Sequence, residues 1–81
     1  MAISARERYI GAFVGVLGVT REALPGLRYR SIPEWDSARH MELVAAVEAE
    51  FGVVLEPDDI LDFSGFEKGM EILSANYGIR F

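Results

Sequence analysis

The amino-acid sequence predicts an all-α fold, a four-helix bundle with three long helices, one short helix and a long first loop. Three observations lead to this prediction. Apolar residues recur at helical spacing in three segments, helix start and stop signals bracket those segments, and no segment alternates with the period of an amphipathic strand. With 81 residues, the chain is expected to form one domain, residues 1–81, around one modest core.

The first long helix is predicted to begin at Ser4. Residues 4–7 read Ser-Ala-Arg-Glu, a capping box in which the Ser hydroxyl and the Glu carboxylate bind backbone N–H groups reciprocally. Gly11 and Gly15 would allow a neighbouring helix to approach closely, and Gly18 is expected to end the helix. The apolar stripe consists of Ile10, Phe13, Val14 and Leu17.

Two arginines, Arg6 and Arg8, precede the apolar run 9–19 and make the N-terminus resemble a secretory signal. No small-x-small cleavage site follows the run, so we interpret it as a core helix. The run is also too short to span a bilayer. We therefore expect a cytoplasmic protein without a membrane span.

Residues 20–36 form the long first loop, in which prolines and a glycine interrupt any regular pattern. A loop of this length in a small domain usually wraps the core or serves function. Its apolar residues are expected to anchor it to the core: Leu24, Leu27, Tyr29, Ile32 and Trp35.

The second long helix is predicted to begin at Asp36 or Ser37 and to end at Phe51, before Gly52. Asp36 is a good N-cap, because its carboxylate accepts from free N–H groups and suits the positive end of the helix dipole. The predicted inward stripe is Met41, Val44, Val47 and Phe51, with Leu43 beside it.

Two further helices follow in the sequence. Pro57 opens a short helical segment over residues 57–61, at a first-turn position that tolerates proline. A second capping box, Ser-Gly-Phe-Glu at residues 64–67, is predicted to start the last helix. That helix should bury Phe66, Met70 and Leu73, with Ile72 adjacent, and end near Asn76 and Gly78.

Composition excludes several classes of chemistry. The sequence has no cysteine and a single histidine, His40, so we expect no disulfide, no metal site and no catalytic triad. His40 lies one turn after Ser37, but we interpret it as an ordinary, partly exposed side chain. No catalytic residue is predicted, and we do not expect an enzyme.

The charge pattern points to protein partners. The net charge is −5, and residues 42–62 hold seven acids and no base. Nucleic acid is an unsuitable partner for such a surface, because phosphate neutralisation needs clustered Lys and Arg. Docking onto basic protein surfaces suits it better, although an acidic run can also be a solvated helix face.

The second helix carries the most specific pattern. Its Asp36-Ser37 start is followed in register by Glu42-Leu43-Val44, Val47-Glu48, and Glu50-Phe51. This pattern resembles the acyl carrier protein family. The resemblance extends over nearly the whole chain, through Leu17-Gly18-Val19, Leu55, the acidic third helix and residues 63–66.

The resemblance implies an acyl-carrier-like bundle in which Ser37 is the attachment point of a 4'-phosphopantetheine arm, beside Asp36. The arm would hold acyl intermediates as thioesters. The implied partners are a phosphopantetheinyl transferase and the acyltransferases, ligases or synthases of the pathway. The carrier itself is expected to be a monomer. The residues expected to bind these partners are Ala38, Arg39, Glu42, Glu48, Asp58, Asp59 and Asp62.

The sequence departs from the family beside the serine. Residue 38 is usually Leu in these carriers and is Ala38 here, while Arg39 stands where an acid or polar residue is common. The Trp35-Asp36-Ser37 form looks more like specialised stand-alone bacterial carriers that serve a dedicated lipid, polyketide or peptide pathway than like carriers of primary fatty acid biosynthesis. The alternative is a carrier-like helical interaction module that lacks the prosthetic group.

Overall fold

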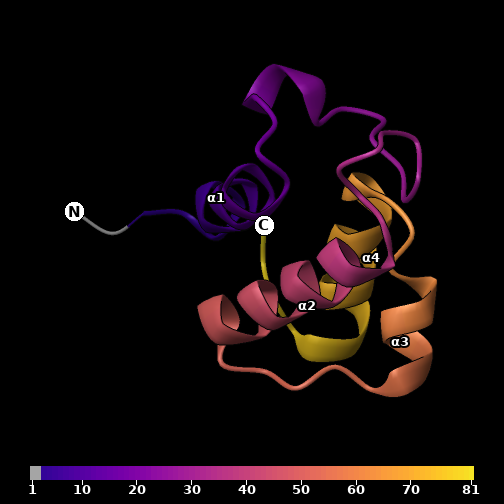
Figure 1. Ribbon diagram of the computed structural model, residues 1–81. Helices are drawn as coiled ribbons and strands as arrows, with labels where there is room; N and C mark the ends of the chain where they lie inside the picture. Colours follow the sequence, from indigo (N-terminus) through magenta and orange to yellow (C-terminus); the bar gives the residue numbers. More distant parts are fainter. Residues whose placement is uncertain (1–2) are drawn as a thin grey trace.

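The structure is a computed structural model that describes residues 3–81. Figure 1 shows its helices and the long loop that follows the first of them. The elements are α1 (Ala5–Leu17), a short 3-10 turn η1 (Arg21–Ala23), α2 (Ser37–Phe51), α3 (Pro57–Asp62) and α4 (Phe66–Tyr77). The described residues contain no strand. The predicted all-α fold, with three long helices, one short helix and a long first loop, is confirmed.

The core lies between α1, α2 and α4, and the first loop closes one end of it. In Figure 1, α4 runs behind α2, α3 lies at one side of α4, and the C-terminus returns to α1. None of the α3 residues is fully buried, so α3 is a surface element held by its flanking residues. The buried apolar residues are Tyr9, Ile10, Phe13, Leu17, Leu24, Leu27, Trp35, Leu43, Val44, Val47, Leu55, Phe63, Phe66, Ile72 and Leu73.

The two ends of α1 form largely as predicted. The Ser4 hydroxyl accepts a hydrogen bond from the Glu7 backbone N–H at 3.1 Å, and Gly18 ends the helix with a left-handed φ of 67°. The other predicted bond of the capping box, from the Ser4 backbone N–H to the Glu7 carboxylate, is wrong. The Glu7 carboxylate instead pairs with the Arg21 guanidinium of η1 at 2.7 Å, which lowers the pKa of Glu7 and raises that of Arg21.

The inward stripe of α2 differs from the prediction at one position. Leu43, Val44 and Val47 are buried, but Met41 is 54% exposed, so its predicted core position is wrong. His40 occupies the stripe instead, one turn before Val44. With His40 on the inward face, Met41 is turned about 100° away from it and lies at the edge of that face, in solvent.

The start of α4 is built by the first loop rather than by a capping box. Gly65 is the N-cap and makes no side-chain cap, so the predicted role of Ser64 is wrong. The Leu27 carbonyl accepts from the Phe66 N–H at 2.9 Å, and the Ser64 carbonyl accepts from the Tyr29 N–H at 2.9 Å. These bonds hold the loop against the segment before α4, which leaves the Ser64 side chain exposed.

Gly69 of α4 leaves room for the Tyr9 side chain of α1 and the Phe63 ring. Tyr9 of α1 is fully buried, and its hydroxyl donates to the Phe66 carbonyl at 2.7 Å. Burial raises the pKa of this hydroxyl, so it stays a donor. A Cβ at residue 69 would overlap the Tyr9 hydroxyl and the Phe63 ring. Gly11 and Gly15 have no such neighbour within 4 Å, so the expected helix contact at those two glycines is wrong.

Gly69→Ala should lower the free energy of unfolding by about 1–3 kcal/mol, because the added methyl group overpacks the α1–α4 contact. Gly15→Ala is the matched control in an exposed helix interior and should raise it by about 0.5–1 kcal/mol through helix propensity. Urea unfolding followed by circular dichroism measures both. Two changes of the same sign would contradict the packing at Gly69.

Candidate functional site

Ser37 is the first residue of α2, and its side chain is exposed. Asp36 before it is the N-cap, and its carboxylate accepts from the Arg39 backbone N–H at 2.8 Å. The Ser37 hydroxyl therefore stands in solvent at the positive end of a fifteen-residue helix. A modifying enzyme can reach it there, and an anion attached to it would be favoured.

Trp35 fixes the chain two residues before Ser37. Its side chain is fully buried, and its backbone is held by a turn in the first loop. The Trp35 carbonyl accepts from the Arg30 N–H at 3.1 Å, and the Trp35 N–H donates to the Ile32 carbonyl at 3.2 Å. Arg30 has a left-handed φ of 66°, which is unusual for a residue with a side chain. The backbone of the loop is therefore strained at Arg30, beside the turn that places Trp35 in the core.

His40 joins the first loop, α2 and α3. Its Nδ1 accepts the indole N–H of Trp35 at 3.0 Å, and its Nε2 lies 2.9 Å from the Ile60 carbonyl oxygen. Because Nδ1 accepts and a carbonyl cannot donate, Nε2 must carry the ring proton. We call this arrangement the Trp35–His40–Ile60 bridge. The ring of Tyr29 also packs on His40, with centroids 5.0 Å apart.

The bridge determines what His40 can do chemically. Both ring nitrogens already have partners, so neither is free to take a proton from Ser37, one turn earlier. The ring is half-buried and supports the loop and α3. No signal in the sequence predicted this role, because Ile60 is twenty residues away.

Arg39 contacts the end of α1. Its guanidinium donates to the Val16 carbonyl at 3.1 Å, and it lies 3.7 Å from the Glu42 carboxylate. The last turn of α1 contains no basic residue, so Arg39 supplies a cation at the negative end of that helix. Ala38 is exposed and leaves the surface beside Ser37 open.

The five acids expected to bind partners fall into two groups. Glu42, Asp58 and Asp62 are exposed. Glu48 instead accepts the Leu55 backbone N–H at 2.8 Å, where it holds the segment after α2.

Asp59 is also engaged within the protein. Its carboxylate accepts from the Asn76 amide at 3.0 Å and from the Tyr77 hydroxyl at 2.7 Å. Partial burial and the Asp59 carboxylate raise the pKa of Tyr77. Asp59 therefore ties α3 to α4, and the acids do not form one uniform patch.

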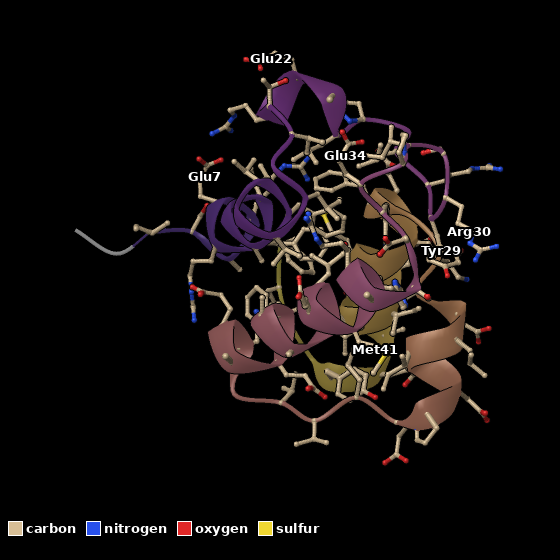
Figure 2. All side chains as sticks on the ribbon, in the orientation of Figure 1. Glu7, Glu22, Tyr29, Arg30, Glu34 and Met41 are labelled. Carbon is tan, nitrogen blue, oxygen red and sulfur yellow. The ribbon has the colours of Figure 1, made fainter. Side chains whose placement is uncertain are left out.

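Three exposed apolar side chains lie on the same two helices or between them. Met41 is 54% exposed on α2, Leu61 is 80% exposed on α3, and Val54 is 82% exposed in the connection. Figure 2 shows Met41 projecting from α2 on the side where α3 lies. Hydropathy placed Met41 in the core, so the sequence reasoning missed it as a surface residue.

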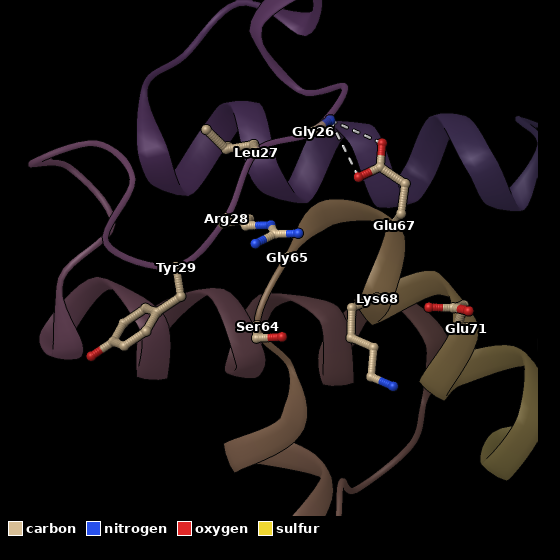
Figure 3. Close-up of a pocket in the computed structure, with 9 residues that line it drawn as sticks. All are labelled: Gly26, Leu27, Arg28, Tyr29, Ser64, Gly65, Glu67, Lys68 and Glu71. Atoms are coloured by element: carbon tan, nitrogen blue, oxygen red, sulfur yellow. Dashed lines mark hydrogen bonds between the residues drawn. The ribbon is translucent and has the colours of Figure 1, made fainter.

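Two of the hollows on the surface of the described residues lie near the first loop. The larger, about 680 Å³, lies between the first loop and the start of α4, where Arg28, Lys68 and Glu71 line it and Glu67 accepts from the Gly26 N–H (Figure 3). Its charges are mixed, and Ser37 does not line it. The smaller, about 380 Å³, directly precedes Ser37 and is lined by Arg30, Ser31, Ile32, Pro33, Trp35 and Asp36.

Two kinds of feature are missing from residues 3–81. No group of three or more His, Cys, Asp or Glu side chains comes together to hold a metal ion in this range. Over the same residues, no helix combines the length and the apolar character that crossing a membrane requires.

His40→Ala should lower the free energy of unfolding by about 1–3 kcal/mol, because it leaves the buried Trp35 N–H without an acceptor. In a Trp35→Phe background, which has no N–H donor, the same change should cost less. Chemical denaturation of the four proteins of this cycle measures the difference. Strictly additive losses would show that the Trp35–His40 hydrogen bond contributes nothing to stability.

Comparison with known proteins gives no relative. No protein-family model, curated protein or solved structure matches the chain.

Proposed function

We propose that the protein is an acyl carrier whose Ser37 bears a 4'-phosphopantetheine arm. The observation that carries this proposal is the exposed hydroxyl of Ser37 at the first position of α2, directly after the Asp36 N-cap. The in-register pattern of α2 and the all-helical fold are what an acyl-carrier-like bundle requires. The arm would supply a thiol that holds acyl groups as thioesters, a group that a chain without cysteine lacks.

The residues around Ser37 fit such a group. Its phosphodiester would lie at the N-terminal end of α2, where N–H groups without helical partners and the helix dipole favour an anion. Asp36 is occupied by the Arg39 N–H, so its carboxylate is held at the cap. The smaller hollow beside Asp36 gives the first part of the arm an open surface. The protein presents the arm and catalyses no step.

Partners would dock on the face formed by α2 and α3. Glu42, Asp58 and Asp62 offer exposed negative charge, and Met41 and Leu61 offer apolar contact beside it. A basic partner surface with an apolar centre is complementary to this face. The transferase that modifies Ser37 and the enzymes that load or remove cargo are the partners we propose.

The departures from the family support a specialised pathway. Arg39 is engaged with Val16 at the end of α1, so this residue serves the protein's own packing. Ala38 offers less apolar contact than the leucine usual there. We infer that partners of a dedicated lipid, polyketide or peptide pathway recognise this surface, with Met41 contributing apolar contact that Ala38 does not provide.

Incubation of the purified protein with coenzyme A and a broad-specificity phosphopantetheinyl transferase should add the mass of one phosphopantetheine group. Trypsin cuts after Arg30 and Arg39, and fragmentation of the peptide of residues 31–39 should place the group on Ser37 rather than on Ser31. Ser37→Ala should abolish the gain, and Ser31→Ala should keep it. An unmodified wild-type protein would favour an interaction module without the prosthetic group.

Reversal of charge on the docking face should slow the modification. The double variant Glu42→Lys, Asp62→Lys should lower kcat/KM of the transferase by about tenfold at low salt and by less at high salt, because the effect is electrostatic. The matched control is the double variant Glu22→Lys, Glu71→Lys, which changes the net charge by the same amount at two exposed acids outside α2 and α3. Equal losses in both proteins would contradict docking at α2 and α3.

A further inference from the structure

The core behind Ser37 is closed by side chains that hydrogen-bond to one another. Trp35, two residues before Ser37, is 0% exposed, and its ring stacks on His40 with an interplanar angle of 22°. His40 binds the Trp35 indole on one side and the Ile60 carbonyl on the other. The bridge therefore spans the gap between α2 and α3 one turn from the Ser37 hydroxyl.

Aromatic rings fill the space inside this closure. Phe13 packs edge-on against Trp35 at 5.5 Å and stacks on Phe63 at 6.2 Å, and Phe63 also contacts the His40 ring at 6.1 Å. Neither of the two hollows described above is lined by the inward residues of α2, which are Leu43, Val44 and Val47. On the path from Ser37 past Trp35, an alkyl chain would have to displace the Trp35 ring, and the hydrogen bond from its indole N–H to His40 opposes that movement.

We infer that Trp35 and His40 determine cargo specificity by closing the core to any chain tethered at Ser37. Cargo then stays outside the bundle, in water. A long alkyl chain in that position would keep its apolar surface exposed, which is unfavourable. The cargo class that suits the site is therefore a short or polar acyl group. The cargo class rests on the proposed function, whereas the closure does not.

The closure can be tested without any modifying enzyme. Because the chain has no cysteine, Ser37→Cys gives a single thiol that N-ethylmaleimide or N-octylmaleimide alkylates at the site of interest. The two adducts should have Tm values within about 1 °C of each other. Trp35 is the one tryptophan of the sequence, and its fluorescence emission should be the same in both. The same pair of adducts at Ser74→Cys, an exposed position on α4, controls for effects of the octyl group itself.

Removal of the Trp35–His40 hydrogen bond should make the Tm values of the two adducts differ. With His40→Ala added to Ser37→Cys, the octyl adduct should melt several degrees above the ethyl adduct, because the chain gains access to the core. Trp35→Phe replaces His40→Ala if the latter does not unfold cooperatively. An octyl-dependent rise in Tm or a shift of Trp35 emission with the bridge intact would overturn the inference. Equal Tm values with the bridge removed would overturn it as well.

The experiments distinguish an error in the proposed closure of the core from an error in the proposed carrier function. Lack of phosphopantetheine addition to wild-type Ser37 refutes the carrier function and leaves the maleimide result valid. If the wild-type protein is modified, acetyl and octanoyl thioesters on it should react with hydroxylamine at rates within about twofold, since both lie in solvent. Strong protection of the octanoyl thioester alone would overturn the cargo class.

Discussion

The hydrogen bond from the Trp35 indole to His40 Nδ1 is the interaction on which the arrangement around Ser37 depends. A buried indole N–H needs an acceptor, and His40 is the residue that provides it. The same ring then donates to Ile60, so one side chain connects the first loop, α2 and α3. Because α3 buries none of its own residues fully, this contact and those of Asp59 add to the hold of the buried flanking residues Leu55 and Phe63.

The same interaction explains how Ser37 can be both exposed and well placed. Trp35 is anchored in the core, and only Asp36 separates it from Ser37, so the start of α2 cannot drift from the bundle. Asp36 closes the helix end through the Arg39 N–H, and Arg39 reaches across to the end of α1. Ser37 is thus presented on a rigid support, which suits an attachment point for a mobile arm.

Local signals were sufficient for the limits of α1 and α2, because caps act on the nearest turn. Gly18 and Gly52 end α1 and α2 in the left-handed conformation, as their positions predicted. Long-range contacts explain the differences. The first loop satisfies the start of α4 in place of Ser64, and Trp35 makes an inward position favourable for His40 and leaves Met41 in solvent. The helix-start position of Ser37 could be predicted from the Asp36 cap, whereas the internal bonds of Glu48 and Asp59 could not be deduced from an acidic run.

The most direct test of this account is a long-range ¹H–¹⁵N NMR spectrum of the His40 imidazole at neutral pH. His40 is the single histidine, so its signals need no separation from others. The structure predicts the neutral tautomer with the proton on Nε2, and a Trp35 indole proton that exchanges slowly with solvent. A proton on Nδ1, or rapid exchange of the indole proton, would contradict the bridge and the placement of Ser37 that depends on it.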